Sequence, residues 1–372
     1  MPQDNPAGSD VAPGRGLIGD LDPFVALDPS SLPASVLAVV LPPLCHGSQS
    51  GDGSGPPPSD RQTSSTMSDT PRSRARTTSG TVARWAPAVL WLTFPFTVGP
   101  AIGEALTHRS SAVVLVASIG LWAMWLVGLV AALAPSTVSL TTLRVVFPAS
   151  LVVAVWCAAV VPDRSGVTVS AALGLTAFAT VLSLWSEVGL VWVNGSSYGD
   201  ERRFPLRAPA PVLFGPVELV WAAMVAPTLA GPMLLAHRHW VWGTVLTAVA
   251  IAMDAAGARI LHQLTRRWLV LVPAGLVLVD RSVLLDAMLT LRQRVASIGY
   301  AREGSDAYDL GGGAIGTQIE LRLTETGDII PTPARRDRHR LVDPIDVDAV
   351  RFTPSRPDRV LEAARERRLT VV

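Results

Sequence analysis

The chain has 372 residues, of which 49% are hydrophobic and 16% are charged, and its formal net charge is +1. Typical soluble domains carry nearer ~25% charged residues, so this composition argues against an ordinary soluble protein, and the near-neutral charge gives no signal for nucleic-acid binding. The two cysteines exclude a disulfide framework and a metal site built from four cysteines.

The first 80 residues are rich in Pro, Gly, Ser and Asp and show no sustained hydrophobic period. Segments such as residues 51–60 cannot bury enough apolar surface to offset the entropy of ordering the chain. The apolar run 34–44 is too short to cross a bilayer. We therefore expect residues 1–80 to form a disordered N-terminal segment, within which Met67 is an alternative start of translation.

Six apolar runs follow between residues 81 and 262, where charged side chains are sparse. Most of them reach the ~20 residues with which a helix crosses ~30 Å of hydrocarbon. Prolines inside such helices are tolerated when neighbouring groups satisfy the freed carbonyls. The sequence thus predicts an α-helical transmembrane bundle over residues 81–262, with the third span the shortest. The expected spans are 86–106, 111–134, 145–162, 168–193, 211–236 and 239–259.

Arginine in the connections between the spans indicates the orientation. With the N-terminus inside, 11 arginines fall on the inner side, and the outer side holds Arg109, Arg164 and Arg238. This is the bias of the positive-inside rule. We expect a multipass protein of the plasma membrane whose N-terminus and C-terminal domain are both cytosolic, an assignment that depends on an even number of spans.

Residues 263–372 change character and read as a small cytosolic domain of strands and one helix. Two β-rich runs meet at Pro273 and Ala274, which is typical of a hairpin. Ser355 and Pro357 are placed to begin a final helix that extends to about residue 368. Seven strands followed by a helix is the order of a β-barrel of the pleckstrin-homology (PH-like) kind. The expected strands are 267–272, 275–280, 286–291, 294–298, 317–323, 327–331 and 347–352.

Two segments of this tail carry a resemblance: RRWLVLVPAGLVLVD, residues 266–280, and RFTPSRPDRVLEAARERR, residues 351–368. They resemble actinobacterial multipass membrane proteins that carry a bacterial PH-like domain at the C-terminus. All 31 basic residues are arginine, which fits a GC-rich genome. The resemblance implies a fold and a genome type, and it implies no catalytic residue.

Three acids lie inside the expected spans, each near the inner end: Glu187, Glu218 and Asp254. A carboxylate in a bilayer is costly unless it is paired or protonated, so such residues usually face the bundle interior or a cavity. We interpret them as an intramembrane polar cluster that binds a proton or cation, with Arg144 or Arg259 as partner. The alternative is that the acids reach the nearby interface or make structural hydrogen bonds.

The segment 334–340 concentrates four arginines, Arg335, Arg336, Arg338 and Arg340. On a cytosolic domain tethered to the bilayer, each base near an anionic surface contributes ~1 kcal/mol, and the effect falls off within a Debye length. The alternative is a solvated loop that neighbouring aspartates partly neutralise. We expect a lipid-facing basic patch at the anionic inner leaflet.

Other motifs point to no chemistry. His237 and His239 form a His-x-His pair without an evident third ligand, so a polar turn is the preferred interpretation. The glycine-rich segment 311–316 (GGGAIG) satisfies a dinucleotide fingerprint but precedes a strand, so we expect a turn. No nucleophile elbow, Walker A loop, HExxH or CxxC motif occurs. The sequence therefore predicts no catalytic residue, no metal and no cofactor.

These observations favour a non-enzymatic membrane scaffold or regulatory protein. Its PH-like domain would bind lipid or a protein partner at the inner leaflet, since such barrels bind many kinds of ligand. The alternative is a small transporter or channel that uses the acids in the membrane. A second alternative, an intramembrane enzyme, lacks a nameable nucleophile or metal.

Overall fold

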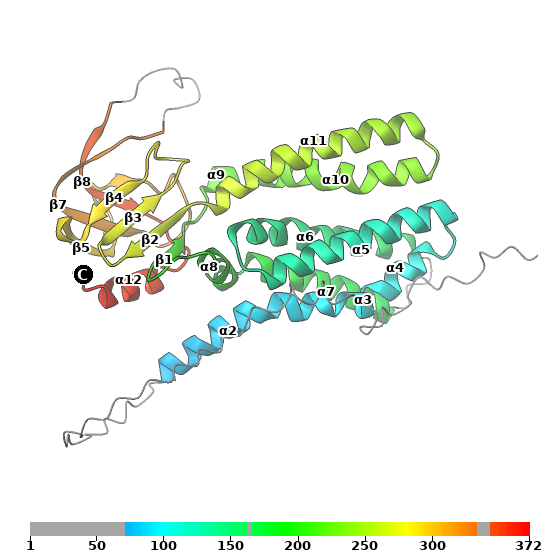
Figure 1. The fold of residues 1–372 in the computed structure, drawn as a ribbon, viewed down its shortest axis with the longest axis horizontal. Coiled ribbons are helices and arrows are strands. Elements are labelled where there is room, and N and C mark those ends of the chain that lie inside the picture. Colours follow the sequence, from blue (N-terminus) through cyan, green and yellow to red (C-terminus); the bar gives the residue numbers. More distant parts are fainter. Residues whose placement is uncertain (1–70, 162–165, 333–342) are drawn as a thin grey trace, which may run out of the picture. The chain divides into compact units, whose positions relative to one another are not determined.

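A computed structural model describes residues 71–161, 166–332 and 343–372 of the chain (Figure 1). Residues 1–70 of the expected disordered segment 1–80 lie outside the described residues. Residues 71–80 belong to helix α2, Pro71–Leu92, so the expectation of disorder is wrong for them.

Five helices in the described residues are long and apolar enough to cross a membrane. They expose many large apolar side chains, such as Ile119, Val181 and Ile251, which is expected of surfaces that face lipid. The prediction of a multipass helical bundle is confirmed at this level. The five spans are α5 (Ser111–Leu133), α6 (Thr137–Val160), α7 (Gly166–Leu184), the segment Ala210–Ala236 and α11 (Trp240–Thr265); within the fourth, α9 (Ala210–Leu213) precedes α10 (Pro216–Ala236).

The first expected span is not a single helix. Residues 86–106 are divided among the end of α2, the short α3 (Phe94–Thr97) and α4 (Gly99–Leu106). Pro95 and Pro100 occupy the first turns of α3 and α4, where a missing N–H is tolerated and a preceding helix cannot continue. The expectation of six continuous spans is therefore wrong for this segment.

Contacts between Arg84 and Leu106 join α2–α4 to α5. Arg84 donates to the carbonyls of Ala132 (3.4 Å) and Leu133 (2.8 Å) at the C-terminal end of α5. Trp91 and Trp125 exchange indole-to-carbonyl hydrogen bonds of 2.7 and 3.1 Å. At the other end, Leu106 of α4 packs in one apolar cluster with Val113 near the start of α5. The broken segment thus lies antiparallel to α5.

Two further boundaries differ from the expected spans. Ser136 caps α6 through the N–H of Ser139, so this helix starts before the expected span 145–162 and contains Arg144. The expected span 168–193 ends at Leu184, and α8 (Ser186–Asn194) follows after a break. Glu187 therefore lies in the first turn of α8, beyond the candidate span.

The second part of the structure, here called the β domain, consists of two four-stranded sheets and one helix. The sheets have the orders β1-β2-β3-β4 and β5-β7-β8-β6. The expected hairpin and closing helix are present, and the two-residue strand β6 was not expected. The expected strands 317–323 and 327–331 are a single strand, β7, whose pairing with β8 shifts register between Arg322 and Gly327. The elements are β1 (Arg202–Pro205), β2 (Trp268–Val272), β3 (Gly275–Val279), β4 (Met288–Leu291), β5 (Val295–Tyr300), β6 (Tyr308–Asp309), β7 (Ile319–Ile329), β8 (Ile345–Phe352) and α12 (Pro357–Glu366).

Strand β1 comes from outside the expected domain 263–372. It belongs to the connection between α8 and α9, and it pairs antiparallel with β2 from Arg202↔Leu271 to Pro205↔Trp268. Phe204 is buried in the same apolar core as strands from both sheets. The β domain is therefore assembled from two separate stretches of the chain, one of them between two spans (Figure 1).

The core of the β domain is built from alternating strand residues and one face of α12. Leu276 and Leu278 of β3 and Leu321 of β7 are buried, as the alternation along β strands requires. Val360 and Leu361 of α12 pack into the same cluster. At ~25 cal/mol per Å² of buried apolar area, such side chains dominate the stability of a small domain.

Candidate functional site

The carboxylate of Glu187 is the first site to consider. Arg356, at the N-cap of α12, donates from Nη2 to Glu187 Oε1, and Arg359 Nη2 lies 3.6 Å from the same oxygen. The side chain of Glu187 is 2% exposed, and those of Arg356 and Arg359 are 34% and 17% exposed. A carboxylate removed from water in this way requires charged partners, and α12 supplies them. The contact fastens the β domain to α8, at the end of the bundle.

Arg144 lies two turns into α6 and beside α8. Its Nε atom is buried and has no hydrogen-bond partner in the described part of the chain. Gly189 of α8 leaves room for the guanidinium, since a Cβ built there would lie 3.3 Å from Arg144 Nη2. Arg144 thus approaches α8 close to Glu187, although no hydrogen bond or ion pair joins the two side chains among the contacts of the described residues.

The remaining members of the expected cluster have other surroundings. Glu218 Oε2 accepts a 2.6 Å hydrogen bond from the N–H of Gly215, which caps α10. Asp254 accepts a 2.9 Å hydrogen bond from Thr228 Oγ1 between α11 and α10. Arg259 is exposed and donates to a carbonyl of its own helix at 3.1 Å. The structure therefore does not bring the five residues together into one site.

The expected basic patch, Arg335, Arg336, Arg338 and Arg340, lies outside the described residues. The strands on either side of it are described, and Ile329 at the end of β7 pairs with Ile345 at the start of β8. The segment that carries the patch therefore connects two neighbouring strands of one sheet.

A buried ion pair that we did not predict lies where α11 continues into β2. Arg267 donates from Nε and Nη2 to the two carboxylate oxygens of Asp280, at 2.8 and 2.6 Å, and from Nη1 to the carbonyl of Arg207 at 2.9 Å. Ser282 donates to Asp280 as well, so both charges are fully satisfied. The hairpin register places Trp268 opposite Val279, which brings the two residues just outside the hairpin together. The two-residue turn at 273–274, which the sequence predicted, already places Arg267 opposite Asp280, so the pair could have been predicted from the hairpin.

A second unpredicted polar group joins α6 to α11. Thr141 Oγ1 lies 3.3 Å from His262 Nδ1 and 3.1 Å from Thr265 Oγ1. Both threonines are buried, and Thr265 also donates to the carbonyl of His262 at 2.8 Å. Hydrogen bonds of this kind link helices in lipid, where a side chain without a partner is costly. We assign the group a structural role at the end of the bundle nearest the β domain.

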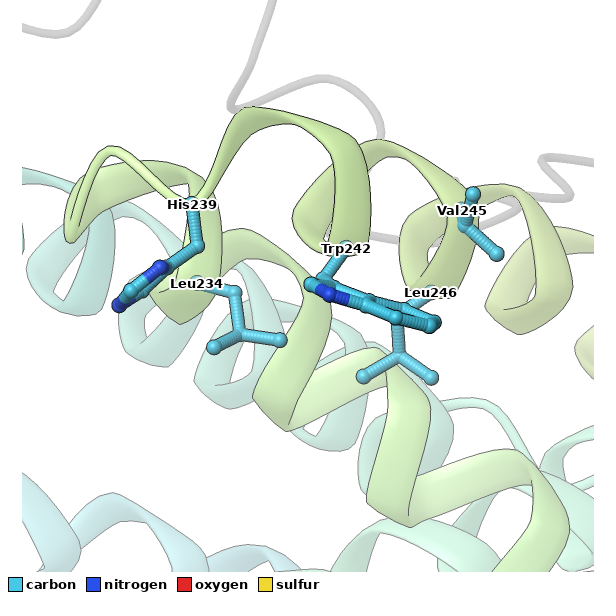
Figure 2. A pocket seen from close by; sticks show the side chains of 5 residues that line it. All are labelled: Leu234, His239, Trp242, Val245 and Leu246. Carbon is cyan, nitrogen blue, oxygen red and sulfur yellow. The ribbon is translucent and has the colours of Figure 1, made fainter.

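At the opposite end of α10 and α11, five side chains line a hollow of about 420 Å³ (Figure 2). Leu234 comes from α10, His239 from the turn, and Trp242, Val245 and Leu246 from α11. The lining is apolar apart from His239, and Trp242 is exposed, as an indole at a membrane interface would be. This composition suits contact with lipid rather than chemistry on a polar substrate.

The turn beside this hollow contains the His-x-His pair. Arg238 between the two histidines has a φ of 63°, and His237 and His239 cap the helices on either side. Within residues 71–161, 166–332 and 343–372, no group of three or more His, Cys, Asp or Glu side chains is arranged to hold a metal ion.

Comparison of the chain with protein-family models, with curated protein sequences and with solved structures finds no match.

Proposed function

We propose that this membrane protein is a non-enzymatic scaffold or regulator whose β domain is a PH-like module. In this proposal the domain lies at the cytosolic face of the plasma membrane and binds anionic lipid headgroups, with a protein partner as the other class of ligand.

One observation carries the proposal: the β domain is joined to the bundle at several separate points. Strand β1, between α8 and α9, supplies an edge of its sheet, and β2 follows α11 almost directly. The buried Glu187 accepts from Arg356 of α12. A domain held in this way cannot leave the end of the bundle, so its ligand must be available at the membrane surface.

The contacts of α2–α4 support a cytosolic β domain. Because this segment lies antiparallel to α5 from Arg84 to Leu106, it fits a sixth crossing despite its proline breaks. Six crossings return the β domain to the side of the N-terminus. The arginines of β1, Arg202 and Arg203, and those at the end of α11, Arg266 and Arg267, then lie on that side, in agreement with the positive-inside rule.

The ligand is proposed from charge. The β7–β8 connection carries Arg335, Arg336, Arg338 and Arg340, and arginine binds phosphate bidentately. A domain fixed at the bilayer presents such a segment to anionic headgroups at high local concentration.

The test uses the full chain in a neutral detergent, with thermal unfolding measured as anionic or zwitterionic lipid is added. A ligand that binds the folded state raises the unfolding temperature with concentration. We expect anionic lipid to stabilise the natural chain, and the variant with all four patch arginines changed to alanine to lose at least half of the shift.

The matched control changes four exposed arginines elsewhere on the β domain to alanine: Arg292, Arg294, Arg302 and Arg365. This variant has the same net charge as the patch variant, and we expect it to keep the shift. Equal losses in both variants would mean nonspecific attraction. The absence of any preference for anionic lipid in the natural chain would refute lipid binding and leave the protein partner as the ligand.

A further inference from the structure

The glycine-rich segment 311–316 and the residues that begin the fourth span are bonded to each other. The N–H of Ala210 donates to the carbonyl of Gly313 at 3.4 Å. Arg207 Nη1 donates to the carbonyl of Ile315 at 3.2 Å. The candidate span starts at Ala210, so these bonds hold a β-domain loop beside the start of that span. Figure 1 shows α9 between the β domain and the pair of α10 and α11.

The glycines explain how the loop reaches this position. Gly312, Gly313 and Gly316 have φ values of 59°, 77° and 142°, which other residues rarely adopt. A Cβ on Gly316 would lie 3.1 Å from Arg207 Nε, which shows how closely the loop approaches this arginine. The loop is therefore shaped to lie against residues 207–211 rather than to hold a nucleotide.

The side chains of the bonded segments are apolar where they are exposed. Ile315 is 64% exposed while its neighbour Ala314 is buried, so the isoleucine projects outward from a fixed loop. Leu213, the last residue of α9, and Phe214, which follows it, are exposed as well. In water, such a set would be an apolar patch without a partner.

Arg207, beside the loop, is exposed, and its carbonyl accepts a 2.9 Å hydrogen bond from Arg267, which follows the exposed Arg266 at the end of α11. Aliphatic and aromatic tips flanked by arginine are typical of protein surfaces that lie in the headgroup region of a bilayer. Leu219, the fourth residue of α10 in the same candidate span, is exposed as well.

We infer that the loop 311–316 is a membrane contact of the β domain: Ile315 inserts into the interfacial layer of the bilayer beside Leu213 and Phe214. The partner is the lipid surface itself. This inference rests on the proposed membrane assignment, but it does not require the β domain to bind a specific headgroup. It assigns the glycine-rich segment a role in setting how the domain lies on the membrane.

The test places one fluorescent label at each of three positions in a chain freed of its own cysteines by Cys45→Ser and Cys157→Ala. The substitutions are Ile315→Cys at the loop, Ile251→Cys within α11 and Val372→Cys at the C-terminus; the replaced residues are 64%, 68% and 72% exposed. In Figure 1, the C-terminus lies at the side of the β domain away from α9. Each labelled protein is reconstituted in phosphatidylcholine vesicles that contain about 30% phosphatidylglycerol, which gives the vesicle surface the negative charge of an anionic membrane.

We expect lipids that carry a quencher near the headgroup to quench the label at position 315 at least threefold more than the label at 372. Lipids with the quencher deep in the acyl chain should quench the label at 251 most. Quenching at 315 no greater than at 372, with 251 quenched, would overturn the loop contact and leave the membrane assignment intact. If neither 251 nor 315 is quenched, both the contact and the membrane assignment fail.

Discussion

Glu187 accepts a hydrogen bond from Arg356, a residue 169 positions later in the chain, and this ion pair ties α8 to α12. We expect Glu187→Gln to destabilise the protein by about 2–4 kcal/mol, because it leaves two partly buried guanidinium groups without their anion. Thermal unfolding in detergent should show the loss, and limited proteolysis should cut near α12 sooner.

An exposed ion pair between β1 and α12 provides the control. Arg202 of β1 and Glu366 of α12 are 2.5 Å apart, with side chains about half exposed. Glu366→Gln should cost about 0–1 kcal/mol, since exposed ion pairs contribute little. A Glu187→Gln effect no larger than that of Glu366→Gln would contradict the proposed importance of the buried contact.

The buried pair Arg267–Asp280 predicts a larger effect. Asp280→Asn removes the anion from a guanidinium that is 2% exposed, so we expect about 3–5 kcal/mol of destabilisation. The exposed Asp286→Asn is the control and should change stability by about 0.5 kcal/mol or less.

The double change Arg267→Met with Asp280→Leu should recover much of the loss, because apolar residues of similar volume often replace a buried pair at little cost. A double variant less stable than Asp280→Asn would show that the hydrogen bond from Arg267 to Arg207 is the dominant contact.

Strand β1 predicts that the β domain requires residues from between the spans. Phe204→Ala should destabilise by about 3–5 kcal/mol, because its ring is buried in the core of the domain. The exposed Phe96→Ala should leave unfolding in detergent nearly unchanged. Residues 263–372 expressed alone should unfold at lower denaturant concentration than the same residues with 201–206 joined to them. Equal stability of the two forms would mean that β1 is only an accessory to the sheet.

The elements that the sequence predicted are those whose pattern lies within a short stretch of the chain. Long apolar runs and the hairpin around Pro273 carry strong local patterns, and they predicted the bundle and most strands. Strand β1 has only four residues, two of them arginine, and it exists because β2 offers an open edge. The end of α7 before Trp185 has no Gly or Pro to mark it, so Glu187 was assigned to a span. Its true partners lie in α12, and no local pattern indicates a contact over that separation.

The packing of α2 against α5 yields the last prediction. A Cβ on Gly128 would lie 2.5 Å from Trp91 Cε2, whereas a Cβ on Gly120 of the same helix would meet nothing within 4 Å. Gly128→Ala must displace the Trp91 indole, which stacks on Phe147 with ring centroids 4.4 Å apart and donates to Trp125. We therefore expect a loss of about 1–3 kcal/mol for Gly128→Ala. Gly120→Ala should be neutral or stabilising by up to about 1 kcal/mol, since alanine favours the helix.

Thermal unfolding of the two variants in one detergent, with tryptophan fluorescence as the probe, compares them directly. Equal behaviour of the two variants would contradict the close packing of α2 on α5, on which the assignment of a sixth crossing depends.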